Sequence, residues 1–203
     1  IYMQKDTLRY RIGVATYSVG VAYNNRKTSL QFIQQEMNNI TALSNETCQL
    51  GIQSRNMVLY IAKKDSPQPI RLMSSVGKQL PLYCTGLGRA LLAYKSEEEI
   101  RNLFPEVLTA YTPHTIATIN DLLKELELTR QRGYAVEHEE TNLMVNCIAV
   151  SLDYNNAPIA ALSISIPTFR ISESKEKEAV QILWEAKQRI ETHFKMYGVD
   201  FGN

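Results

Sequence analysis

Apolar residues recur along this chain at two different periods, and the change of period predicts where a helix gives way to strands. Between positions 28 and 44 they fall three or four residues apart, which is the spacing of one helix face. This stripe consists of Leu30, Ile33, Met37, Ile40 and Leu43. We predict a helix that ends near Ser44, with the stripe buried in its own domain; packing against a partner subunit is the less common alternative.

From Thr47 the period becomes two, which is typical of strands with one buried face. The alternation leads through a turn at 54–56 into an apolar run at 57–62, and another alternating segment begins at Ile70. Later strands are predicted at 134–138, from 145 to the Asn155-Asn156 turn, and at 159–166. Because hairpins join most of these strands, we predict an α+β fold with a largely antiparallel sheet and flanking helices.

Capping residues predict the helices between and after these strands. Ser96 heads a helix that Pro105 stops, and Asp121 caps a helix that ends at Gly133. A long helix runs from Ser172 to about Tyr197. Its predicted buried stripe consists of Ala179, Leu183, Ala186, Ile190, Phe194 and Tyr197.

The N-terminal stretch 1–12 is predicted to form two short strands around a Lys5-Asp6 turn, followed by a short helix from Gly13. A lone hairpin is only marginally stable. The chain also begins with Ile rather than Met. We therefore expect this stretch to belong to a larger unit upstream.

The stretch Gly77–Tyr94 combines a helix start with two glycines. Thr85 is a suitable N-cap, and Gly86 and Gly88 follow in the first turn, with an apolar stripe that ends at Tyr94 behind them. Glycine is a poor helix former, so we expect something to approach this backbone closely. An anion held by first-turn amides and tight packing on a sheet explain the glycines equally well.

Two hydroxyls and a thiol are predicted to face the same side of the sheet. Ser163 and Ser165 share one strand face, and Cys147 lies on the preceding strand. Together with the amides near Gly86 and Leu87 they could hold a small carboxylate. Such serines more often bond neighbouring backbone, and such a cysteine is more often inert.

Composition removes several classes of function. At 203 residues the chain suits one sizeable domain, and a net charge of +1 gives no general attraction to nucleic acid or anionic membranes. No apolar run has the length of a membrane span. Three widely spaced cysteines without a CxxC motif indicate a reducing, cytoplasmic compartment. The three histidines lie far apart, so we expect no metal site. We also expect no cofactor and no catalytic residue.

Three blocks of the sequence resemble the effector-binding domain of IclR-type transcriptional regulators. They are Gly77–Ala93, with the order G-x-x-x-P-L-Y-C-T-G-L-G-R-A-L-L-A, then Thr112–Ile116, then Arg132–Pro167. The resemblance covers nearly the whole chain. It implies a GAF-like domain whose curved antiparallel sheet has a pocket on its concave side, and a small organic-acid effector such as a 2-oxo acid or a sugar acid. The family's pocket positions correspond here to Gly86, Leu87, Glu137, Val145, Cys147, Ser163 and Ser165.

The resemblance also implies a domain organisation. Residues 1–12 correspond to the wing hairpin of a DNA-binding domain, 13–25 to a linker helix, and 26–203 to the effector-binding domain. The implied partners are operator DNA, through an N-terminal domain missing from this chain, and further copies of the chain in a homodimer or tetramer. No membrane partner is expected. Two alternatives remain: a GAF-like enzyme that uses Cys84 and Cys147, and a ligand-free dimerisation module.

Several positions depart from the family pattern. Glu137 stands where Asp is usual, and its extra methylene would reach further into the pocket. Met144 replaces a usual Gly, Ser151 a usual Pro, and Arg89 a commoner Lys. Leu87 is bulkier than the common Ala. These departures affect the identity of the ligand more than the fold.

Overall fold

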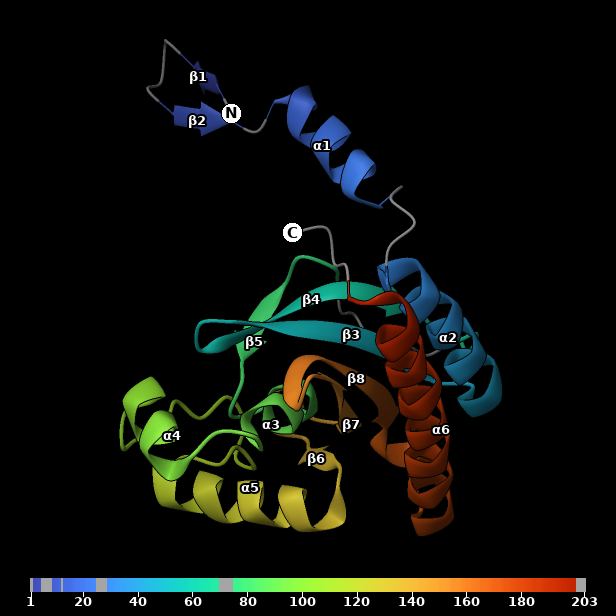
Figure 1. Cartoon of the computed structure of the whole chain (residues 1–203). Helices are drawn as coiled ribbons and strands as arrows, with labels where there is room; N and C mark the ends of the chain where they lie inside the picture. Colours follow the sequence, from blue (N-terminus) through green and yellow to red (C-terminus); the bar gives the residue numbers. More distant parts are fainter. Residues whose placement is uncertain (1, 5–8, 12, 25–28, 70–74, 200–203) are drawn as a thin grey trace.

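The N-terminal elements agree with the expected hairpin and helix. The computed structural model describes residues 2–4, 9–11, 13–24, 29–69 and 75–199. Strand β1 (Tyr2–Gln4) pairs antiparallel with β2 (Arg9–Arg11), and α1 (Val14–Asn24) follows (Figure 1). The predicted Lys5-Asp6 turn lies outside the described residues.

A six-stranded antiparallel sheet, curled into a half-barrel, forms the centre of the molecule, as the α+β prediction requires. Its strand order is β5-β4-β3-β8-β7-β6. The strands are β3 (Thr47–Ser54), β4 (Met57–Lys64), β5 (Gln79–Pro81), β6 (Ala135–His138), β7 (Val145–Tyr154) and β8 (Ala157–Pro167). The hairpin at Asn155-Asn156 is confirmed, and both asparagines have the positive φ of a tight hairpin turn. The segment predicted from Ile70 lies outside the described residues, and β5 was not predicted as a strand.

Helices cover the two faces of this sheet separately (Figure 1). On one face lie α2 (Ser29–Ser44) and α6 (Glu173–Tyr197), which pack on each other and on a hydrophobic core. On the other face lie α3 (Gly86–Leu92), α4 (Glu97–Leu103) and α5 (Ile119–Arg132). A single 3₁₀ turn, η1 (Thr168–Arg170), links β8 to α6.

The helical stripes are buried in the chain's own core, except at their ends. In α2 the first four stripe residues are buried, which confirms the domain-core interpretation, but Leu43 is 57% exposed. In α6 the stripe is buried through Phe194, but Tyr197 is 75% exposed. The predicted burial of Leu43 and Tyr197 is therefore wrong, because each lies in the last turn of its helix, where core contact ends.

Capping explains where the helices on the other face begin. Thr85 caps α3 as predicted, since its hydroxyl accepts a hydrogen bond from the Gly88 amide. Helix α5 begins three residues earlier than expected, because Thr118 and not Asp121 is its N-cap. Tyr94 lies beyond the end of α3 and is 50% exposed, so its predicted place in the core is wrong.

Tight packing accounts for one of the two glycines of α3. A Cβ atom on Gly88 would lie 2.1 Å from the carbonyl oxygen of Leu82, far inside any possible contact. A Cβ on Gly86 would lie 3.3 Å from the Cβ of Cys147, which is close but possible. The loop before α3 therefore requires Gly88, and the first turn of α3 at Gly86 lies directly against β7.

Candidate functional site

A row of polar side chains crosses the sheet face that carries α3. The strand register places Glu137 of β6 opposite Cys147 of β7, and Cys147 opposite Ser165 of β8. Two residues along β8, Ser163 lies opposite Gln49 of β3. Side chains alternate along a strand, so all five point to the same face. We call Glu137, Cys147, Ser165, Ser163 and Gln49 the polar row.

Hydrogen bonds connect the members of the polar row to one another. The Cys147 Sγ and the Ser165 Oγ lie 3.0 Å apart. Ser165 Oγ donates to Gln49 Oε1 at 3.0 Å, and Ser163 Oγ donates to the same oxygen at 3.4 Å. The two serine hydroxyls thus bond a side chain of the neighbouring strand, and one acceptor atom collects both.

Glu137 ends the row as a buried carboxyl group. Only 1% of the residue is exposed, and its Oε1 accepts hydrogen bonds from the backbone amides of Glu140 (2.6 Å) and Thr141 (3.1 Å). Burial raises the pKa of Glu137 to about 7, although Cys147 and the two amides act in the opposite direction. Glu137 therefore exchanges its proton near neutral pH.

An ion pair behind Glu137 holds this end of the row in place. Arg89 of α3 is 2% exposed and pairs with the buried carboxylate of Glu140. The same guanidinium donates to the carbonyl oxygens of Tyr83 (3.0 Å) and Val136 (2.9 Å). Arg89 thus ties α3, the loop before it and β6 to the loop that carries Glu140.

The segment 112–116 holds the same loop from the other side. The Thr112 hydroxyl donates to the Glu139 carbonyl at 2.7 Å, and the Thr115 hydroxyl donates to the Glu140 carbonyl at 2.6 Å. The Ile116 amide donates to the Glu140 carboxylate at 3.1 Å. The three blocks on which the family resemblance depends therefore meet at the loop that carries Glu140. In sequence, Glu140 lies 51 residues from Arg89.

Glu137 and Glu139 do not share a strand face. Strand β6 ends at His138, and Glu139 has a φ of 56°. The Glu139 carboxylate turns back to accept from the Met144 amide at 2.7 Å. Only Glu137 of these two acidic residues belongs to the polar row.

The remaining sequence-predicted residues lie around Cys147. Gly86 is closest, because its backbone approaches β7 so nearly that a Cβ there would lie 3.3 Å from the Cys147 Cβ. Val145 lies two residues before Cys147 on the same face of β7. The Leu87 side chain is buried in the apolar core, so Leu87 can offer a ligand only its amide. Within the described chain, the amides of Gly86 and Leu87 have no hydrogen-bond partner.

Sequence reasoning missed two residues of this site, Gln49 and Tyr60. The alternation of Cys48 and Leu50 already places Gln49 on the opposite strand face, so its burial there was a readable signal. Tyr60 lies close enough for burial and the neighbouring Cys147 and Glu137 to raise the pKa of its hydroxyl. It stays a neutral phenol beside the row.

The chemistry of the site suits binding rather than catalysis. Burial raises the pKa of Cys147 well above its usual value, and Glu137 raises it further, so the thiolate that a nucleophile requires is disfavoured. Burial also raises the pKa of Cys84.

In the residues that the structure describes, no group of three or more His, Cys, Asp or Glu could hold a metal ion. None of the described helices combines the length and apolarity needed to cross a membrane.

Comparisons with known proteins give the family context of this site. The model of the family "Bacterial transcriptional regulator IclR C-terminal" matches residues 22–192. The HTH-type transcriptional regulator KdgR of Dickeya chrysanthemi is 32% identical over 192 residues, which is 94% of this chain and 63% of KdgR. The chain thus spans less than two thirds of that relative. Such relatives are named as regulators of transcription, not enzymes.

Solved structures share the fold. The crystal structure of Thermotoga maritima IclR is 30% identical, covers 94% of this chain and 77% of its own, and superposes with a TM-score of 0.81. An IclR homologue of Microbacterium hydrocarbonoxydans, complexed with 4-hydroxybenzoate, is 23% identical and has a TM-score of 0.78. That alignment covers 96% of this chain and 79% of the homologue, and shows a common fold.

Proposed function

Because this chain belongs to the IclR family of bacterial transcriptional regulators and carries its effector-binding domain, we propose that its effector is a small organic acid, of the 2-oxo-acid or sugar-acid class. In this proposal residues 1–12 are the end of a winged DNA-binding domain, 13–25 are the linker helix, and 26–203 sense the effector. Operator DNA is bound through the N-terminal domain, by a homodimer or tetramer.

The buried polar row is the observation that carries the proposal. A carboxylate needs several donors, and the hydroxyls of Ser163 and Ser165 face the same side of the sheet as the free amides of Gly86 and Leu87. Both serines now bond to Gln49, so their hydroxyls can turn to a stronger, charged acceptor. The effector would lie against Cys147 and Val145.

Glu137 favours an acid effector when it carries its proton. A protonated carboxyl group donates one hydrogen bond, whereas a carboxylate would repel the effector's own charge. Its pKa of about 7 allows the protonated form at neutral pH. The Microbacterium neighbour supports the ligand class, because 4-hydroxybenzoate is an organic acid held by the same fold.

Effector binding would change operator affinity through the arrangement of the subunits. A ligand shifts such an equilibrium only by its different affinity for the two states, typically by about 1–3 kcal/mol. The Arg89–Glu140 ion pair gives this site a fixed frame within one subunit. Because this ion pair fixes the loop that carries Glu140, we expect the movement between subunits to start from contacts of the bound effector and not from rearrangement of that loop.

Calorimetric titration of the chain with a panel of 2-oxo acids and aldonates tests the proposal. We expect at least one acid to bind to the wild type and to lose most of its affinity in the Ser163→Ala/Ser165→Ala variant. The matched control is Ser151→Ala, which removes a hydroxyl from the same face of β7 outside the polar row. Equal binding by all three proteins would refute the assigned site, and no binding by any acid would favour a ligand-free dimerisation module.

A further inference from the structure

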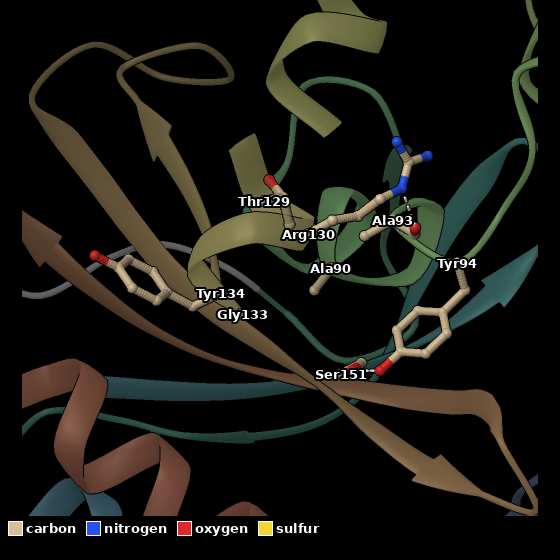
Figure 2. A pocket seen from close by; sticks show the side chains of 8 residues that line it. All are labelled: Ala90, Ala93, Tyr94, Thr129, Arg130, Gly133, Tyr134 and Ser151. Carbon is tan, nitrogen blue, oxygen red and sulfur yellow. Dashed lines mark hydrogen bonds between the residues drawn. The ribbon is translucent and has the colours of Figure 1, made fainter. Parts of the chain in front are cut away.

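A second hollow lies at the opposite end of α3 from the polar row. It is a pocket of about 250 Å³ between the C-terminal ends of α3 and α5 and the middle of β7 (Figure 2). Small residues leave this space open. Ala90 and Ala93 of α3 line it, and so does Gly133, whose φ of 79° ends α5 in the left-handed conformation.

One aromatic ring bounds the pocket. Figure 2 shows the Tyr94 ring with its hydroxyl directed at Ser151 of β7, whereas the Tyr134 ring, beside Gly133, points away from Ala90 and Ala93. The Tyr94 ring and the small aliphatic groups make a lining that suits a flat apolar molecule.

The positive charge at the pocket is paired with a carboxylate. Arg130 donates through Nε to the Ala93 carbonyl at 2.7 Å and through Nη2 to the Lys95 carbonyl at 2.9 Å. Its Nη1 donates to the Glu127 carboxylate at 3.0 Å. Three of the five N–H groups of Arg130 are thus engaged, and the neighbouring carboxylate offsets its charge, which weakens its attraction for an anionic ligand.

Two hydroxyls of the pocket, those of Ser151 and Tyr94, offer acceptors rather than donors. Ser151 Oγ donates to the Tyr94 hydroxyl at 3.1 Å, and that hydroxyl donates to Asp153. Lys187 donates to Ser151 Oγ at 3.2 Å, and two acidic groups, Asp153 and Glu191, neutralise it. Both hydroxyl hydrogens are used, but each oxygen keeps room to accept another bond.

We propose that this pocket binds a small uncharged ring that carries one O–H or N–H donor, such as a phenol or an indole. The ring lies between Tyr94 and the Ala90–Ala93 surface, and its donor group bonds Ser151 or the Tyr94 hydroxyl. The size is sufficient, because a cavity of about 150 Å³ accommodates benzene. This ligand class differs from the organic acid proposed for the polar row, and the inference does not depend on that proposal.

Titration of the chain with phenol tests this site, with Trp184 as the reporter. Trp184 is the only tryptophan in the chain, and its Cζ2 atom lies 3.3 Å from the position of a Cβ on Gly133. We expect phenol to change Trp184 emission with saturation. Toluene, which lacks the donor, should bind about fivefold more weakly, as the loss of one neutral hydrogen bond implies. Benzoate should bind more weakly than phenol.

Two variants place the ligand in the pocket, and circular dichroism verifies that each is folded. Ser151→Ala should reduce phenol affinity about fivefold and leave toluene unchanged. Ala93→Leu should fill the pocket and abolish binding of both. Ser165→Ala, in the polar row, is the control that should keep phenol affinity. The proposal is overturned if phenol gives no saturable response, if benzoate binds as tightly as phenol, or if Ser151→Ala leaves the phenol-to-toluene ratio unchanged.

Discussion

The two faces of the central sheet are built from the same strands but differ in the size and polarity of the side chains that they present to the helices. Towards α2 and α6, the strands present large aliphatic side chains such as Ile148, Leu162 and Ile164, which close that core completely. Towards α3 they present Ala135, Ala149 and Ala161, together with the polar row. These latter side chains are too small to fill the space by themselves.

This difference shows how one antiparallel sheet can serve stability and recognition at once. Since side chains alternate strictly, residues 147–150 of β7 supply both faces in turn. The α2/α6 face obtains its stability mainly from apolar burial, with an ion pair between Glu36 and Arg189 joining its two helices. The α3 face replaces part of that burial with an ion pair, close backbone contact and hydrogen bonds. The ion pair, the close backbone contact and the hydrogen bonds can each be removed separately by mutation.

The largest effect is expected from breaking the buried ion pair. Arg89→Met leaves the Glu140 carboxylate buried without its partner and should lower the free energy of unfolding by about 3–5 kcal/mol. Urea denaturation measures this loss. Arg101→Met is the control, because Arg101 pairs with Glu97 in solvent and its loss should matter far less. Equal losses would mean that the α3 face is stabilised by burial, like the other one.

Close backbone packing gives the next largest effect. Gly88→Ala places a methyl group 2.1 Å from the Leu82 carbonyl oxygen and should cost about 3 kcal/mol of stability, since backbone must move. Gly86→Ala comes no closer than 3.3 Å to any neighbour, the Cys147 Cβ, and should unfold at nearly the wild-type denaturant concentration. The smaller change should still weaken binding at the polar row. If Gly88→Ala is as stable as Gly86→Ala, the packing explanation of this glycine fails.

Glu137 should make stability depend on pH in a way that the apolar face does not. In the unfolded chain its pKa is near 4.5, and in the folded chain it is about 7. Between these values only the folded state keeps the proton, so the free energy of unfolding falls by about 1.4 kcal/mol per pH unit as pH rises. Above pH 7 both states are ionised and this contribution stays constant.

Glu137→Gln removes this titration and keeps an oxygen for the amides of Glu140 and Thr141. Urea denaturation at several pH values compares the two proteins. The variant should gain stability relative to the wild type from about pH 5 to about pH 7 and then stay constant. A difference that does not vary with pH would show that Glu137 is ionised throughout. The affinity of the wild type for an acid effector should fall as pH rises through about 7, where Glu137 of the folded protein loses its proton.

The smallest expected effect is an increase in stability, at Met144. Met144 precedes β7 with a φ of 68°, a conformation that costs an ordinary residue about 1–2 kcal/mol. Met144→Gly should stabilise the protein by up to about 1 kcal/mol after the greater flexibility of unfolded glycine is deducted. Met144→Ala keeps the Cβ and should show no such gain. Thermal unfolding of the two variants side by side decides the matter.

The sequence was most informative where a single period governs the contacts. The α2 and α6 stripes and the shared face of Cys147, Ser163 and Ser165 follow from helix and strand periodicity alone. Periodicity does not show where core contact stops, and so the burial of Leu43 and Tyr197 was wrong. The same alternation could have located Gln49, which belongs to the first strand of the predicted sheet.

Other parts of the site depend on contacts that no local pattern contains. Arg89 and Glu140 are 51 residues apart, and only the folded chain shows that they neutralise each other. The resemblance to a family supplied Glu137 as a site position, but not the reason that Glu137 is buried. That reason lies in the amides of a loop whose path the segment 112–116 fixes.

The contacts that Glu140 makes with Arg89 and Thr115 constrain how these three positions can evolve. A change at any one of these positions removes a partner from a charge or a carbonyl group inside the protein, so we expect single replacements to be selected against. Positions 89 and 140 should consequently evolve as a pair, and descendants that alter one should carry a compensating exchange at the other. Correlated substitutions at positions 89 and 140 among relatives would then reveal the ion pair, which neither residue indicates by itself.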